Sequence, residues 1–231
     1  MAIPKIVTPE HETTLPSGKR VKFRPFLVKE EKILLMMKEN AEFGNIVDSM
    51  LKVVANCVES DLDVPNISYG DLEHLFVSMR ARSVGETIDI SWECKECGEK
   101  FPVSVNVSNI VPNGEYPKDT NVMLGQNIGV TVKPVPAKHI GQVAKVSETN
   151  PVEILHYVIE SIFTDEGIHK FSDYDAKERS EFIESLSMTH VKDILEMVES
   201  FPKCCIRQTV NCPACGHEQE ILLEGLENFF T

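Results

Sequence analysis

The chain of 231 residues is 42% hydrophobic and 26% charged, the composition of a folded protein with one large domain or two small ones. Its formal net charge of −13 argues against non-specific binding to nucleic acid or to an anionic membrane surface, because phosphate contacts need a positive surface. No apolar run approaches the roughly 18 residues that span a bilayer, and residues 1–14 lack the features of a secretory signal. We therefore expect no membrane span and a protein that is made and kept in the cytosol.

The first part of the chain predicts a strand pair followed by three helices. Residues 13–26 alternate apolar and basic side chains around the turn-forming cluster PSG at 16–18. Residues 28–39 predict a helix, and residues 69–82 predict another that begins after Ser68. Between these two helices, apolar side chains at helical spacing predict the buried stripe of a further helix, formed by Val47, Met50, Val54 and Cys57.

The remaining elements are predicted in the same way. Strands flank a cysteine pair at 86–94 and 100–107, and proline and glycine residues mark 113–124 as a connector. A strand and a helix follow over 129–146. Asn150 and Pro151 then have the form of a helix start. The stripe predicted for that helix consists of Leu155, Val158, Ile159 and Ile162. The last predicted elements are helices at 173–186 and 189–199 and strands at 204–212 and 218–225.

The two parts of the chain resemble each other. Residues 71–98 align with residues 189–216 without a gap, at a constant offset of 118, and this alignment superimposes two cysteine pairs. The predicted elements also recur in a similar order. We therefore predict an α+β fold of two pseudo-duplicated strand–helices–hairpin units, spanning 1–112 and 125–231 on either side of the 113–124 connector. The alternative is that two strand–turn–strand units arose independently.

Four of the seven cysteines form two C-x-x-C-G motifs. This spacing places both thiols of a pair on one tight turn, and the following glycine allows the turn to adopt a positive φ. Two such zinc-ribbon-like knuckles supply the four soft ligands that a tetrahedral structural Zn²⁺ requires. We therefore predict one structural zinc site shared by the two units, and its ligands are Cys94, Cys97, Cys212 and Cys215.

Other interpretations of these cysteines are weaker. A second, separate site would need Cys204 or Cys205 together with His217, and the first half has no equivalent ligands. A redox dithiol of the thioredoxin type would precede a helix, whereas each pair here lies between predicted strands. A catalytic zinc needs an open coordination position, which four cysteines do not leave. No other motif indicates catalysis, so we expect a protein that is not an enzyme.

Two segments carry a resemblance to a known family. Residues 15–39 read LPSGKRVKFRPFLVKEEKILLMMKE, and residues 84–98 read VGETIDISWECKECG. Both resemble the baseplate hub proteins of T-even-type contractile-tailed bacteriophages, in which a Lys/Arg-rich strand leads into a Met/Leu-rich helix and a later strand carries cysteines. The resemblance runs from around Leu15 to the C-terminus and is most specific in RPFLVKEEK.

The resemblance implies a structural or chaperone-like assembly protein that acts through protein–protein contacts. Its expected partners are other baseplate hub and central spike proteins, and self-association into a homo-oligomer is left open. The expected location is the virion tail baseplate, the host cytoplasm during assembly, or both. Arg20, Lys22, Arg24 and the helix after them form one candidate docking surface. The alternative is a zinc-ribbon regulator that binds nucleic acid or polymerase, and the acidic composition counts against it.

Overall fold

The computed structural model describes residues 7–39, 43–147 and 150–225 of a mixed helix and sheet protein. The strands are β1 (His11–Thr14), β2 (Arg20–Phe23), β3 (Thr87–Glu93), β4 (Lys100–Asn106), β5 (Val111–Pro112), β6 (Asn121–Met123), β7 (Ile128–Val132), β8 (Ile159–Thr164), β9 (Gly167–Lys170), β10 (Cys204–Asn211) and β11 (Glu218–Glu224). The α-helices are α1 (Val28–Glu39), α2 (Phe43–Cys57), α3 (Tyr69–Ser83), α4 (Ile140–Ser147), α5 (Leu155–Val158), α6 (Ala176–Glu184) and α7 (Met188–Glu199). Short 3₁₀ helices are η1 (Val64–Asn66), η2 (Val107–Asn109), η3 (Ala137–His139), η4 (Pro151–Ile154) and η5 (Phe171–Asp173).

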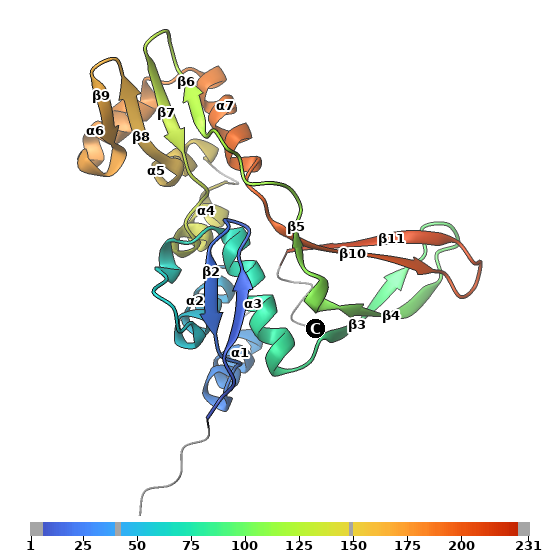
Figure 1. Cartoon of the computed structure of the whole chain (residues 1–231). Helices are drawn as coiled ribbons and strands as arrows, with labels where there is room; N and C mark the ends of the chain where they lie inside the picture. Colours follow the sequence, from blue (N-terminus) through green and yellow to red (C-terminus); the bar gives the residue numbers. More distant parts are fainter. Residues whose placement is uncertain (1–6, 40–42, 148–149, 226–231) are drawn as a thin grey trace, which may run out of the picture.

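Three parts of the molecule are distinguishable in Figure 1. One body contains the β1–β2 hairpin with α1, α2 and α3, and a second contains the β6–β9 sheet with α5, α6 and α7. An arm to one side contains the β3–β4 and β10–β11 hairpins, so it joins segments from both halves of the chain. The mixed helix and sheet fold is therefore confirmed.

The first body follows the sequence predictions closely. The β1–β2 hairpin turns at Gly18, whose φ of +83° suits glycine, and its antiparallel register pairs Thr14 with Arg20. Helix α1 begins and ends where it is predicted to. All four residues of the predicted stripe on α2 are fully buried. Cys57 belongs to that stripe, and burial raises the pKa of its thiol to about 11, as expected of a thiol used as a small apolar side chain.

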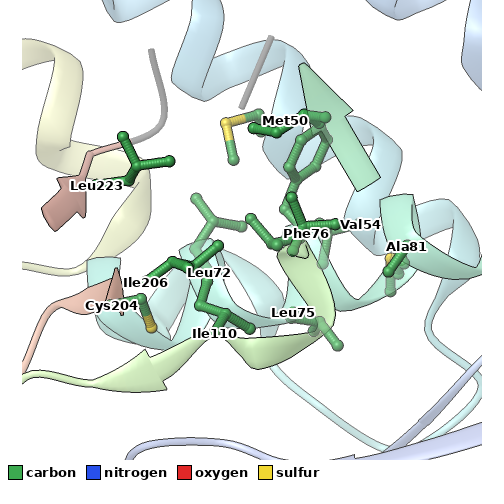
Figure 2. Packing of buried hydrophobic residues seen from close by; sticks show 14 of the residues in the cluster. Met50, Val54, Leu72, Leu75, Phe76, Ala81, Ile110, Cys204, Ile206 and Leu223 are labelled. Carbon is green, nitrogen blue, oxygen red and sulfur yellow. The ribbon is translucent and has the colours of Figure 1, made fainter. Parts of the chain in front are cut away.

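Helix α3 lies at the centre of the larger hydrophobic core. It begins at Ser68, whose hydroxyl accepts a hydrogen bond from the Asp71 N–H at 3.0 Å. At its first turn, a Cβ on Gly70 would lie 2.3 Å from the carbonyl oxygen of Pro202, so only glycine allows the chain before β10 to pack this closely. Figure 2 shows side chains of α2 and α3 packed with side chains of β10 and β11. Those labelled are Met50, Val54, Leu72, Leu75, Phe76, Ala81, Ile110, Cys204, Ile206 and Leu223.

The second body has its own core beneath an antiparallel sheet with strand order β6-β7-β8-β9. Helices α6 and α7 begin with capping boxes at Asp175 and Ser187. The buried residues of this core come from the sheet and from α5, α6 and α7 and the segments next to them; they are Val122, Val130, Val132, Leu155, Val158, Ile159, Phe171, Ile183, Val191, Ile194 and Phe201.

The helix predicted from Asn150 onward is wrong. The chain forms only η4 and the four-residue α5 before it continues as strand β8. Leu155 and Val158 are buried as expected, but Ile159 and Ile162 lie on the strand, and the side chain of Asn150 does not cap the helix. The reason is tertiary: β8 pairs with β7 on one side and β9 on the other, and these interactions override the helical spacing of its apolar residues.

The two cysteine hairpins occupy equivalent positions in the sequence. Strand β4 and strand β11 are offset by the same 118 residues as the cysteine motifs. Both hairpins bury side chains in the first core, from Phe101, Val103 and Val105 on β4 and from Ile221 and Leu223 on β11. The segment predicted as a connector, 113–124, is not free of regular structure, because it contains strand β6. Its first residue is tied to the chain before β10, since the Asn113 N–H donates to the carbonyl oxygen of Lys203 at 2.9 Å.

Candidate metal centre

The first cysteine motif forms a tight turn between β3 and β4. The Cys94 N–H donates to the carbonyl oxygen of Glu99 at 2.8 Å, and the Gly98 N–H donates to the carbonyl oxygen of Cys94 at 2.9 Å. Gly98 has a φ of +74°, a conformation that residues with a side chain rarely adopt. Local sequence therefore accounts for the shape of this turn.

The second motif repeats this geometry between β10 and β11. The Cys212 N–H donates to the carbonyl oxygen of His217 and the Gly216 N–H donates to that of Cys212, both at 2.9 Å. Gly216 also has a φ of +74°. The glycine predicted to permit each turn thus has the same role in both.

The arm brings the two turns together so that their four sulfur atoms all lie within 4.8 Å of one another. The Sγ atoms of Cys94 and Cys215 are 3.7 Å apart, and those of Cys97 and Cys212 are also 3.7 Å apart. A tetrahedral zinc site with sulfur at about 2.3 Å has sulfur–sulfur edges of about 3.8 Å, whereas a disulfide bond is about 2.05 Å long. The four cysteines are free thiols that lie close enough together to hold a metal ion.

The contacts across the site are reciprocal. The first cysteine of each motif is buried, with 2% of its surface exposed, and approaches the exposed second cysteine of the other motif. The two turns are also joined by a hydrogen bond from the Lys95 N–H to Oε1 of the buried Gln219 on β11, at 3.2 Å. Trp92 on β3, two residues before Cys94, is half-buried against the first core.

The pKa values of the first cysteines of the two motifs are lowered, and those of the second cysteines are raised. The backbone N–H of Cys215 lowers the pKa of Cys212 to about 7, and the backbone N–H of Cys97 lowers the pKa of Cys94. The N–H of Glu99 also lowers the pKa of Cys97, but the thiol of Cys215 and burial outweigh it and raise that pKa to about 12. Four thiolates in one place repel one another, so a bound cation is needed for all of them to ionise.

The residues of the alternative second site lie elsewhere. The Cys204 thiol is buried and donates a hydrogen bond to the carbonyl oxygen of Gly70 at 3.2 Å, so it serves the contact between α3 and β10. His217 is exposed. Among the described residues, only one group of three or more His, Cys, Asp or Glu side chains is close enough to hold a metal ion. It consists of Cys94, Cys97, Cys212 and Cys215.

Two of the three basic side chains predicted to form a docking surface on and after β2 are paired with carboxylates. Arg24 is only 11% exposed, and its guanidinium donates to both carboxylate oxygens of the buried Glu30, at 3.0 and 3.3 Å. The Leu27 N–H donates to the same carboxylate, so Arg24 fixes the start of α1 and is not part of a docking surface. Lys22 pairs with Glu10 at 2.8 Å, while Arg20 remains exposed. The sequence signal that could have shown this pairing is the short RPFLVKE segment, which holds both charges.

Fold and site together define an α+β protein in which two hairpins from distant parts of the chain unite four cysteines. The family model described as T4 bacteriophage base plate protein matches residues 8–231, and the chain belongs to this family. The baseplate hub assembly protein gp26 of Enterobacteria phage T4 is 22% identical over 215 residues, covering 92% of this chain and 93% of that protein. No solved structure matches the chain. Within the described ranges, no helix is both long and apolar enough to cross a membrane.

Proposed function

We propose that this protein is a non-enzymatic structural or assembly protein of a phage tail baseplate hub, acting through contacts with other hub and spike proteins. The observation that carries the proposal is similarity over nearly the whole length of both chains to a protein named for baseplate hub assembly. Membership of the base plate family, which covers residues 8–231, supports it. The proposed location is the virion tail baseplate, with an assembly stage in the host cytoplasm.

We further propose that Cys94, Cys97, Cys212 and Cys215 bind one structural Zn²⁺. The support is the two cross-motif sulfur distances of 3.7 Å, close to the edge of a tetrahedral thiolate site. Four protein ligands leave no position for a substrate or water, so the ion would stabilise the fold. It would cross-link residues 115 and 121 positions apart in sequence and hold the two hairpins of the arm together.

The proposed duplication gives this site a simple origin. Exchange of the two motifs converts the Cys94–Cys215 contact into the Cys212–Cys97 contact, which is the other short distance. The common offset of the motifs and strands supports two units at 1–112 and 125–231 with the 113–124 connector between them. In this view each unit contributes one zinc-ribbon-like knuckle to a single pseudo-symmetric site.

The test of the hub function is genetic complementation. Phage lacking the gene for this protein should fail to build complete tails, and the wild-type protein supplied by the host should restore them. Electron microscopy of lysates and plaque counts measure both outcomes. Normal tails in the absence of the protein would overturn the proposal. Peptide analysis of purified virions would distinguish a resident baseplate component from a protein that acts only during assembly.

A further inference from the structure

A large cleft lies on the second body, next to the first. Its volume is about 680 Å³, within the range of ligand-binding pockets. Asn66 of η1 contributes from the first body, and the other walls come from η3, η4, α5, β8, β9, η5 and α6. The two bodies are tied together beside it, because the Ala137 N–H donates to the carbonyl oxygen of Ile67 at 2.9 Å. The cleft therefore lies at the edge of the second body, beside its junction with the first, and such junctions are common positions for binding sites.

The cleft is positively charged on a strongly acidic protein. Lys133, Lys138, Lys170 and Arg179 line it, and none of them forms an ion pair with another residue in the described part of the chain. The chain as a whole carries a formal charge of −13, so other surfaces would repel an anion that this cleft attracts. Unpaired cations gathered in one concave place indicate a ligand of negative charge.

Arg179 gives the strongest single indication. Its Nε is buried and has no hydrogen-bond partner among the residues that the structure describes. The guanidinium carbon lies 6.0 Å from the centre of the Phe171 ring, which holds the group in place from one side. Because Arg179 lines the cleft while its Nε is shielded from solvent, the rest of its planar guanidinium is placed to donate two parallel hydrogen bonds to a carboxylate.

The composition of the cleft favours a peptide over nucleic acid. Glu153 and Glu160 also line it, and these carboxylates would repel a continuous polyphosphate backbone. Beside them, the rings of His139 and Tyr157 lie with their centroids 4.6 Å apart and their planes tilted by 39°, and they offer an apolar surface. Separated negative charges on a chain that also has apolar side chains fit this mixed surface.

We propose that this cleft binds an acidic peptide segment of a partner protein, with Arg179, Lys133 and Lys170 receiving its carboxylates. The inference rests on the proposed hub function, because it specifies the surface through which one hub contact is made. Arg179 makes the fixed bidentate contact, and the more flexible lysines supply charge around it.

The first experiment measures fluorescence anisotropy of a rhodamine-labelled peptide in which glutamate alternates with leucine, titrated with the full-length protein. Binding should weaken as salt increases, and the same labelled peptide with glutamine in place of glutamate should not bind. Arg179→Gln should weaken binding by about tenfold or more. The double variant Lys133→Gln/Lys170→Gln should weaken it as well and serves if Arg179→Gln does not fold. Lys118→Gln, which removes an exposed lysine outside the cleft, is the matched control and should bind like the wild type.

Equal binding by the wild type and both cleft variants would overturn the inference. Stronger binding of a single-stranded oligothymidylate with the same number of charges would do so too. Complementation with the same variants separates this inference from the hub function. If the wild type restores tails and the cleft variants do so equally well, the cleft is not the hub contact and the proposed function stands. If phage lacking the protein build normal tails, the proposed function fails whatever the peptide does.

Discussion

Helices α3 and α7 precede the two cysteine hairpins at equivalent positions in the chain, yet they differ in how far they are buried. Most of α3 is buried, including polar residues such as Asp71 and Glu73, whereas α7 buries only Val191 and Ile194. The difference arises because both hairpins pack on the first core. Helix α3 is therefore enclosed by its own hairpin and by the one that follows α7, while α7 covers one side of the second sheet.

The largest expected effect comes from removing the proposed zinc ion, which would join the two cysteine hairpins that pack on the first core. Native mass spectrometry should find one zinc in the wild type and none in Cys212→Ser. Loss of the ion should lower the free energy of unfolding by several kcal/mol, on the order of 5, because metal binding is coupled to folding. Denaturant unfolding with and without chelator measures this change.

A matched cysteine variant controls this prediction. Cys205→Ala removes a buried thiol outside the cluster, so it should retain one zinc. A wild type without zinc, or a Cys212→Ser variant that keeps it, would contradict the shared site.

The second effect tests whether α3 is buried as described. It uses the carboxyl group of Glu73, which lies on this helix. Burial raises the pKa of Glu73 to about 7, although the Cys204 N–H donates to it at 3.2 Å. Its unfolded pKa is near 4.5. Below pH 4.5 the Glu73 carboxyl is neutral in both the folded and the unfolded state. Between pH 4.5 and 7 it ionises only in the unfolded state, so the free energy of unfolding falls as the pH rises. The expected loss of unfolding free energy is about 3 kcal/mol.

Glu73→Gln should abolish this pH dependence and make the protein more stable than the wild type at pH 8. The measurement is the difference between the two unfolding free energies from pH 4 to pH 8, which cancels the other carboxyl groups. Parallel curves for the two proteins would show that Glu73 is not enclosed as described.

The third effect compares the first turns of the two helices directly. Gly70→Ala would ordinarily stabilise a helix by about 1 kcal/mol, but here the Cβ meets the Pro202 carbonyl oxygen at 2.3 Å. We expect a net loss of about 1 to 3 kcal/mol from overpacking. Met188→Ala, at the equivalent position of α7, alters a side chain that is 74% exposed and should be nearly neutral. Thermal unfolding measures both, and stabilisation by Gly70→Ala would refute the close contact.

The smallest effect concerns the helix caps. The hydroxyls of Ser68 and Ser187 accept hydrogen bonds from the first turns of α3 and α7, at 3.0 and 3.2 Å. Ser68 is buried and Ser187 is exposed, so water can replace only the second bond. Ser68→Ala should cost about 1 to 2 kcal/mol and Ser187→Ala about 0.5 to 1. Equal losses in urea titrations would mean that enclosure does not matter at this position.

Much of the candidate site could be predicted because its parts are local. Each C-x-x-C-G motif fixes its own turn through hydrogen bonds within six residues, and the glycine after the second cysteine has the expected positive φ. The meeting of the two motifs could be inferred only by counting ligands, since neither motif alone completes a tetrahedral set. The cleft around Arg179 gave no signal in the sequence, because its lining residues come from many separate elements.

The sequence by itself determined the features whose causes lie within a few residues: the β1–β2 turn, the stripe on α2, the start of α3 at its Ser68 cap and the two cysteine turns. Tertiary structure alone decided that residues 159–164 pair as a strand and that the last hairpin leaves the second body for the first core. The physical reason is that hydrogen bonding and chain geometry act locally, whereas burial depends on which distant surface is available to cover an apolar face.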